Sequence, residues 1–269
     1  MKINNKTKVL YIIPLLLIIG IVIFFLLNPF YTNEDSDFIE MVNNKAISAN
    51  ILIINATEDS GSVTYSTGQS GVIYKQDNGK YYALTALHGM PSEDEKSTTK
   101  LIVLGYTQPT YADYLEAGGH YEGLSTYYTQ FPEAVIEYYD EAYDLAVISF
   151  QSENEYAVLS ISSKPPIYKE PVVAMGNPHN GNRNTITTGR ITSKKPVPFG
   201  DEAGENQHYI IRHSAKSSIG FSGGALINKD MDIVGIHLGG GENLFGMFVN
   251  GNAMPCDKIL DFLREMNNH

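Results

Sequence analysis

Residues 219–240 read IGFSGGALINKDMDIVGIHLGG, and this stretch is the most informative about the fold. Two short apolar runs, ALIN and DIVGIHLG, follow a serine that lies among Gly220, Gly223 and Gly224. Glycine accepts backbone conformations that strain other residues, so such a loop is able to aim two backbone N–H groups at one oxygen atom. The segment predicts Ser222 on a tight turn between strands, with a plain glycine-rich turn as the alternative interpretation.

The same pattern continues outward over most of the chain. Short runs rich in Val, Ile, Tyr and Thr alternate with turn residues, as in SGVIYKQDNGKYYALTAL, where Asp77, Asn78 and Gly79 fit the closing turn of a hairpin. About a dozen such runs without a long helical period predict an all-β barrel or sandwich. Only residues 256–267 have helical spacing, and the Tyr-rich stretch 106–128 is interpreted as an elaborated loop or hairpin.

Composition excludes several classes of protein. A hydrophobic content of 43% with 18% charged residues excludes disorder and a coiled coil. The net charge of −11 argues against nucleic-acid binding, which needs a basic surface. A single cysteine, Cys256, leaves no pair for a disulfide or a zinc site. We expect no metal and no cofactor, because no recognisable ligand spacing relates the histidines outside the motifs below, which are His120, His179, His208, His213 and His269.

Residues 9–27, VLYIIPLLLIIGIVIFFLL, form a nearly unbroken apolar run. At about 1.5 Å per residue the run is long enough to cross a bilayer, and it predicts a membrane-spanning signal anchor. A cleaved signal peptide is the alternative, although its apolar region is usually shorter and ends in a small-x-small site. Lysines precede the run and acidic residues follow it, which predicts a cytoplasmic amino terminus and an extracellular domain.

The chain is accordingly divided into four parts. Residues 1–8 are assigned to a cytoplasmic tail, 9–27 to the anchor, 28–45 to a polar tether and 46–269 to one folded domain. A domain of this size buries one large or two small cores. An extracellular domain without disulfides is typical of a bacterial surface protein.

Two further segments carry chemistry. His88 ends an apolar strand in the sequence TALHGM, and Asp144 begins the apolar strand DLAVISF. Acyl transfer by a hydroxyl needs a base to take its proton and an anion to orient that base. Each residue alone is more typical of a strand edge than of a catalytic site.

Taken together, in the order His, Asp, Ser, these segments resemble the chymotrypsin-like serine proteases, in particular the bacterial Deg/HtrA-type and glutamyl-endopeptidase-type enzymes. The resemblance extends over about residues 46–265. Four segments carry it: SGVIYKQDNGKYYALTALHGM, FPEAVIEYYDEAYDLAVISF, VVAMGNPHNGNRNTITTGRITS and IGFSGGALINKDMDIVGIHLGG. It implies two six-stranded antiparallel β-barrels, at about 46–152 and 165–255, followed by a C-terminal helix at 256–267.

The resemblance also implies roles for individual residues. Ser222 is the expected nucleophile, His88 the general base and then acid, and Asp144 the carboxylate that fixes the imidazole. The backbone N–H groups of Gly220 and Ser222 are the expected oxyanion hole. Asp140 is the competing carboxylate, but Asp144 stands directly before the apolar strand, where the family places its aspartate.

This chain departs from the family pattern at two positions. Phe221 stands where Deg-type enzymes commonly have Asn, and Leu87 replaces the usual Ala beside the histidine. Neither change removes a catalytic group. A serine loop biased by Phe221 toward an inactive conformation is an alternative to a constitutively active one. About 30 residues follow His237 in the sequence, so we expect it to lack the peptide-binding PDZ domain that Deg/HtrA proteins append.

The resemblance places Lys216, Ser217 and His237 around the pocket for the substrate residue that precedes the cleaved bond. Deg-type enzymes generally have Asn where this chain has His237, and glutamyl endopeptidases have His. A histidine with a neighbouring hydroxyl is a suitable receptor for a carboxylate. A packed strand histidine is the alternative, and Lys216 has the alternative of facing solvent.

The sequence therefore predicts a membrane-anchored extracytoplasmic serine endopeptidase that acts on proteins or peptides, with a preference for Glu or Asp before the cleaved bond. Two other functions stay open at this point. One is a Deg-like quality-control protease that prefers small aliphatic residues. The other is a catalytically silent binding module with the protease fold.

Overall fold

The structure, a computed structural model, describes residues 33–91, 97–179, 182–199, 208–242 and 246–268. The chain divides into two units, Met1–Phe38 and Ile39–His269, and the description below concerns the second. Helix α2 (Asn33–Lys45) crosses the boundary between these units and is followed by the 3₁₀ helix η1 (Ile47–Ala49).

Helix α2 occupies most of the segment that the sequence analysis assigned to a polar tether. Its sequence, NEDSDFIEMVNNK, contains neither glycine nor proline, the two residues that most disfavour a helix. Val42, in its second half, is fully buried. Residues 33–45 are thus ordered secondary structure, anchored by an apolar side chain.

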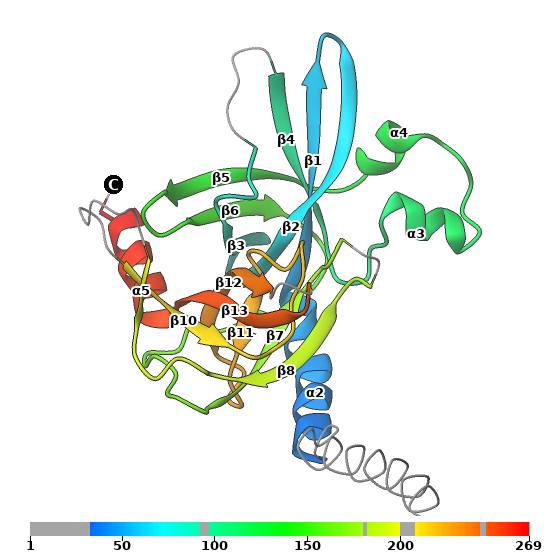
Figure 1. The fold of residues 1–269 in the computed structure, drawn as a ribbon. Helices are drawn as coiled ribbons and strands as arrows, with labels where there is room; N and C mark the ends of the chain where they lie inside the picture. The colour runs from blue at the N-terminus through cyan, green and yellow to red at the C-terminus, as the bar shows by residue number, and fades with distance from the viewer. Residues whose placement is uncertain (1–32, 92–96, 180–181, 200–207, 243–245, 269) are drawn as a thin grey trace, which may run out of the picture. The chain divides into compact units, whose positions relative to one another are not determined.

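The first half of the large unit is a closed six-stranded barrel, in the strand order β1-β2-β3-β6-β5-β4 (Figure 1). Its strands are β1 (Asn50–Asp59), β2 (Ser62–Asp77), β3 (Lys80–Ala86), β4 (Ser97–Leu104), β5 (Glu133–Asp140) and β6 (Leu145–Gln151). Asn78 and Gly79, with φ of +49° and +80°, make the tight turn between β2 and β3. Alternate side chains fill the barrel, and Ile51, Leu84 and Val147 are among those with no exposed surface.

The second half is a seven-stranded antiparallel sheet in the order β8-β7-β11-β12-β13-β10-β9, where a six-stranded barrel was predicted. Its strands are β7 (Pro171–Gly176), β8 (Thr185–Arg190), β9 (Val197–Phe199), β10 (His208–His213), β11 (Ala225–Ile227), β12 (Ile233–Glu242) and β13 (Phe248–Pro255). Beyond β8, the chain meets β10 only at an isolated bridge, Ile191 to His213, and at neighbouring hydrogen bonds such as that of the Thr192 amide with the Arg212 carbonyl oxygen. In its place β10 pairs with the short β9, whose Pro198 lacks an N–H to extend the ladder.

Helices are few in the large unit. Helix α5 (Cys256–Met266) follows β13, close to the predicted bounds, and buries Ile259 and Phe262. The all-β fold with a C-terminal helix agrees with the sequence analysis. Figure 1 shows α5 on one side of the barrel and the short helices α3 and α4 on the other.

The Tyr-rich stretch 106–128 is neither a plain loop nor a hairpin, because it contains α3 (Tyr111–Glu116) and α4 (Leu124–Tyr128). A capping box begins α3: the Thr110 hydroxyl accepts from the Asp113 amide, and the Asp113 carboxylate accepts from the Thr110 amide. The tyrosines supply the packing that such short helices need, since Tyr111, Tyr127 and Tyr128 join one buried cluster with side chains of β1 and β4.

One part of the predicted fold is corrected. In the stretches of chain that the structure describes, no helix has the length and apolar character needed to cross a membrane, so the membrane-spanning helix is withdrawn from the fold. Residues 9–27, for which that helix was predicted, lie outside the described residues. The location of the domain outside the cytoplasm rested on the same segment and stays a prediction.

Candidate active site

Ser222 lies in a turn before β11, and two glycines shape its loop. Gly220 has a φ of +101° and Gly223 a φ of +81°, conformations that strain any residue with a Cβ. A Cβ at Gly223 would lie 2.2 Å from the carbonyl oxygen of Ser70, in the first barrel. The two halves of the unit therefore meet at the serine loop, and only glycine fits at this contact.

Neighbouring strands bring His88 and Asp144 together. The ladder between β3 and β6 ends with the pair Ala86 and Leu145, so the residue after β3 and the residue before β6 meet at one edge. The Leu87 amide donates to the Asp144 carbonyl oxygen at 3.0 Å, which extends the pairing by one step. The sequence marks each residue as a strand end, and the register places the two ends side by side.

The three side chains form a continuous chain of hydrogen bonds. The Nδ1 atom of His88 lies 2.7 Å from Oδ2 of Asp144, and the backbone N–H of His88 donates to Oδ1 at 2.8 Å. The Nε2 atom of His88 lies 2.9 Å from Oγ of Ser222. Because a carboxylate only accepts, Nδ1 carries the proton and Nε2 is the acceptor that faces the serine hydroxyl. This is the arrangement in which an imidazole takes a proton from a serine.

Asp140, the competing carboxylate, has a different role. It is the last residue of β5, and its Oδ1 accepts from the Ala142 amide at 2.7 Å. That bond closes the turn toward Asp144 and directs the side chain into its own loop. Of the two aspartates, the structure places only Asp144 against His88.

The contact with Asp144 also changes the acidity of His88. The hydrogen bond to the carboxylate raises the pKa of His88 above its ordinary 6.5, and partial burial of the ring opposes that increase. The His88 side chain is 44% exposed and that of Asp144 is 17% exposed. The carboxylate is thus shielded behind a ring that remains open to the cleft.

Two backbone amides of the serine loop are free to bind an oxyanion. Among the described residues, neither Gly220 N–H nor Ser222 N–H donates to another group. The Ile219 carbonyl oxygen accepts from the His179 amide at 2.9 Å. Carbonyl and N–H point in opposite directions across a trans peptide bond, so this contact keeps the Gly220 N–H turned away from His179.

Ser70, which the sequence analysis did not single out, holds the serine loop from the first barrel. Its hydroxyl donates to the Gly220 carbonyl oxygen at 2.7 Å, and its amide donates to the Ser222 carbonyl oxygen at 2.9 Å. The same hydroxyl accepts from the Asn177 amide at 2.7 Å. Both residues with free amides are therefore fixed through their carbonyls. Nothing local in the sequence marks Ser70, since its partners are far along the chain.

A cleft of about 650 Å³ opens at the serine, and the predicted pocket residues divide around it. Ser217 and His237 line the cleft together with His88 and Ser222. Lys216 is exposed and is not among the lining residues; its carbonyl oxygen accepts from the Thr187 hydroxyl at 2.7 Å. The structure thus brings Ser217 and His237 to the site and places the Lys216 side chain outside it.

A second histidine lies behind His237. Nε2 of His213 is 3.2 Å from Nδ1 of His237, and both side chains are buried. Burial lowers the pKa of His237 to about 3 and that of His213 to about 4, so both rings are neutral at pH 7. A Cβ at Gly251 would lie 2.2 Å from the His213 ring, so this pair requires glycine on β13. The sequence analysis missed the role of His213, because its ring reaches His237 across β13, where His213 stands opposite Gly251.

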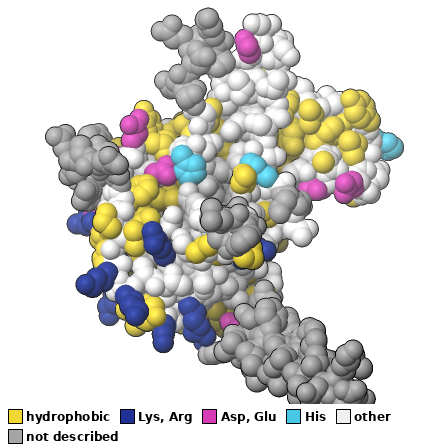
Figure 2. Space-filling view, in the orientation of Figure 1, with side chains coloured by type: hydrophobic (Ala, Val, Ile, Leu, Met, Phe, Trp, Pro, Cys, Tyr) yellow, Lys and Arg dark blue, Asp and Glu magenta, His cyan; other side chains and the backbone are white. Residues whose placement is uncertain are grey.

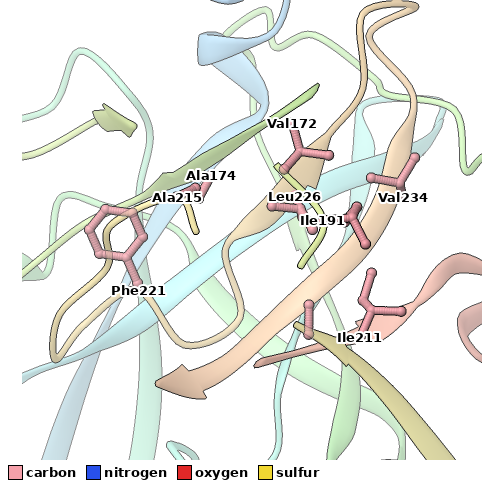
Figure 3. Close-up of a cluster of buried hydrophobic side chains, with 9 residues drawn as sticks. Val172, Ala174, Ile191, Ile211, Ala215, Phe221, Leu226 and Val234 are labelled. Carbon is pink, nitrogen blue, oxygen red and sulfur yellow. The ribbon is translucent and has the colours of Figure 1, made fainter. Parts of the chain in front are cut away.

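Phe221, the departure beside the nucleophile, is an anchor of the second core. Its ring is buried in one cluster with Val172, Ala174, Ala215 and other side chains of the second half (Figure 3). The ring also makes an edge contact with His237, with centroids 6.1 Å apart. Phe221 therefore anchors the serine loop to the core of the second half. With Phe221 in this position, the N–H groups of Gly220 and Ser222 have no acceptor among the described residues.

Charge is distributed unevenly on the face shown in Figure 2. Lys and Arg side chains gather over the second half and its flanking loops, whereas most Asp and Glu side chains lie over the first barrel and α3. The half that carries Ser217 and His237 is thus the more basic part of an acidic protein with a net charge of −11.

The fold and the hydrogen-bonded Ser-His-Asp arrangement define a peptidase of the trypsin type. The trypsin-like peptidase domain family matches residues 69–236, and the chain belongs to this family. The assignment to the trypsin-like serine proteases, made from four segments of sequence, is confirmed.

Particular relatives are named serine proteases. The chain is 30% identical over 213 residues to the serine protease Do-like HtrA of Lactococcus lactis, an alignment that covers 75% of this chain and 45% of the relative. It is 28% identical over 200 residues to the serine protease Do-like HtrA of Bacillus subtilis, with 73% and 39% covered. The chain thus spans less than half the length of these relatives. A crystal structure of the serine endoprotease from Yersinia pestis shares the fold, with a TM-score of 0.56, 24% identity, and 85% and 66% of the two chains covered.

Proposed function

We propose that the chain is a serine endopeptidase that hydrolyses peptide bonds in protein substrates. The observation that carries this proposal is the chain of hydrogen bonds from Asp144 through His88 to Ser222, with contacts of 2.7 and 2.9 Å. The named activity of the HtrA relatives supports it.

In the proposed reaction, Ser222 Oγ attacks the peptide carbonyl carbon while His88 Nε2 takes the hydroxyl proton. Asp144 stabilises the imidazolium and keeps its Nδ1–H in place. The carbonyl oxygen, now an oxyanion, accepts from the N–H groups of Gly220 and Ser222. One such donor contributes about 3 kcal/mol to the transition state. His88 then protonates the leaving amine, and water repeats the sequence on the acyl-enzyme.

A fluorophosphonate probe tests this proposal, because it reacts with a serine only when a neighbouring base activates the hydroxyl. We expect covalent labelling of the full chain at Ser222, measured as a mass increase on the peptide that contains it. The Ser222→Ala chain is the matched control and should take no label. A folded parent chain that stays unlabelled would instead favour a binding module with a silent triad.

We further propose that the cleft accepts Glu, and Asp less well, before the cleaved bond. His237 is neutral, so it would bind a carboxylate as an N–H donor and not as a cation. The proposal requires the tautomer in which His213 Nε2–H donates to His237 Nδ1, so that the remaining proton of His237 is on Nε2, the nitrogen not engaged by His213. The Ser217 hydroxyl lines the same cleft and supplies a second donor.

His237→Asn tests this preference, since Asn is the residue that Deg-type enzymes generally carry there. We expect kcat/KM for Glu substrates to fall about 10- to 100-fold, the value of a hydrogen bond to a charged group. Matched substrates with Val or Ala at that position should change far less, and they control for damage to the fold. A parent enzyme that prefers Val or Ala, with no response to the substitution, would exclude the acidic preference and favour a Deg-like preference for small aliphatic residues.

A further inference from the structure

The side chain of His179 joins the two halves of the unit across the cleft. Its Nε2 lies 2.7 Å from the carbonyl oxygen of Gly68, on β2 of the first barrel. The residue is exposed, and both His179 and Gly68 line the cleft that contains Ser222. The reaction proposed above uses neither this ring nor this carbonyl.

The Gly68 carbonyl is available because a bulge interrupts the pairing of β1 with β2. The register moves from Leu52 opposite Ser70 to Ile54 opposite Thr67, which leaves Gly68 and the next residue outside the paired positions. Bulges of this kind turn backbone groups out of a ladder. The result is a backbone acceptor at the rim of the cleft, which an extended peptide is able to use for main-chain pairing.

His179 is held in place from its own side of the cleft. Its amide donates to the Ile219 carbonyl oxygen, and Pro178 before it has a fixed φ. Asn177 is buried and donates through Nδ2 to the Ile51 carbonyl oxygen at 2.8 Å. A Cβ at Gly220 would lie 2.8 Å from Cδ2 of the His179 ring, so the ring packs directly against Gly220 of the serine loop. The bond to Gly68 therefore starts from a fixed loop.

The position of this bond relates it to one side of the substrate. The lining residues named so far form two groups: Ser217 lies beside Gly240 of β12, the strand that carries His237, whereas His179 is bonded to Gly68 of β2. Under the proposed function, the acyl side of the substrate binds beside Ser217 and His237. The leaving side must then extend toward Gly68, whose carbonyl oxygen is already bonded to the His179 ring.

We propose that His179 is a specificity-determining residue that closes the leaving-group end of the cleft by its hydrogen bond to Gly68. A small leaving group departs without disturbing the ring. A substrate that continues as polypeptide beyond the cleaved bond displaces the ring before its own backbone reaches the Gly68 carbonyl. This inference rests on the proposed function and adds a selection against long leaving segments.

The test compares two substrates with the same acyl sequence, cleaved by the full chain. One releases an aminocoumarin and the other a four-residue peptide. We expect His179→Ala and His179→Phe to raise the ratio of kcat/KM for the peptide over the aminocoumarin about three- to tenfold, the contribution of a neutral hydrogen bond. The ratio cancels any general loss of activity, and both variants keep the amide that binds Ile219. His120→Ala, on the exposed segment between α3 and α4, is the matched control and should leave the ratio unchanged.

Two results would overturn the inference. An unchanged ratio in His179→Ala would mean that the ring does not oppose long leaving segments. A ratio that rises in His179→Ala but not in His179→Phe would attribute the effect to the volume of the ring and not to its hydrogen bond.

A measurement without turnover separates this inference from the proposed function. The Gly68 carbonyl only accepts, so the hydrogen bond requires the His179 proton on Nε2. We expect ring ¹⁵N–¹H spectra of the Ser222→Ala chain at pH 8 to give the Nε2–H tautomer for His179, identified by its loss in His179→Phe. The Nδ1–H tautomer would refute the hydrogen bond between His179 and Gly68 even if the parent chain is an active protease. The Nε2–H tautomer, together with a parent chain that cleaves neither substrate, would uphold that hydrogen bond and refute the proposed function.

Discussion

Ser222→Ala is expected to lower the rate of peptide hydrolysis by about 10⁶-fold, because the substitution removes the attacking atom and leaves the imidazole without a proton to transfer. Ser222 is only partly buried, and within the described part of the chain its hydroxyl has a hydrogen bond to the His88 ring alone. The free energy of unfolding should therefore change by less than about 1 kcal/mol. Initial rates on a fluorogenic peptide and a urea titration of both chains measure the two effects.

His88→Ala, combined with Ser222→Ala, makes this prediction sharper. Residues that act as one unit do not have additive effects, so the double variant should be no slower than either single variant. Comparable turnover by Ser222→Ala and the parent would remove the protease proposal. A loss of activity that accompanies unfolding would trace the effect to the fold instead of the chemistry.

The serine loop explains why this site requires both halves of the unit. Ser70 of the first barrel holds the carbonyls of Gly220 and Ser222, and the His237 carbonyl oxygen of β12 accepts from the Gly223 amide at 2.8 Å. The nucleophile belongs to the second half in sequence, whereas its base and its aspartate belong to the first. Neither half alone positions the reacting groups.

The parts of the site that the sequence predicts are those that end a strand or form a turn. His88, Asp144 and Ser222 each stand at a boundary between an apolar run and turn residues, and the family pattern orders them. Ser70 and His213 lack such a signal, because each acquires its role from a partner across a sheet or a cleft. A local pattern reports a strand end, but it does not report which distant group the strand end meets.

In the fold, too, features set by sequence neighbours are predictable and features set by distant contacts are not. Alternating apolar runs and the turn at Asn78 indicate strands and hairpins, which depend on neighbours in sequence. Closure of the second sheet depends on how far its edge strands pair, and the end of β8 reaches β10 only through the bridge at Ile191 and a few hydrogen bonds beside it, such as that of the Thr192 amide with the Arg212 carbonyl oxygen. The helices of the Tyr-rich stretch depend on packing against β1 and β4, so their short patterns do not reveal them.

Asp144→Asn is expected to lower kcat by about 10⁴-fold without unfolding the chain. The carboxylate accepts from both Nδ1 and the backbone N–H of His88, at 2.7 and 2.8 Å. Asn replaces one carboxylate oxygen by an NH₂ group, and an NH₂ group that faces Nδ1 favours the tautomer with the proton on Nε2, which no longer accepts from Ser222. Asp140→Asn is the matched control, since its carboxylate bonds the Ala142 amide, and its activity should stay close to that of the parent.

The pH profile of the same variant gives an independent check on this assignment. Hydrolysis needs neutral His88, so the rate rises with pH as the ring loses its proton. The bond to Asp144 is the largest cause that raises the His88 pKa, and the acid limb of the parent should therefore lie above pH 6.5. Asn carries no charge to stabilise the imidazolium, so the limb of Asp144→Asn should move to lower pH while its plateau falls. An acid limb that keeps its position in Asp144→Asn but moves in Asp140→Asn would assign the third member of the triad to Asp140.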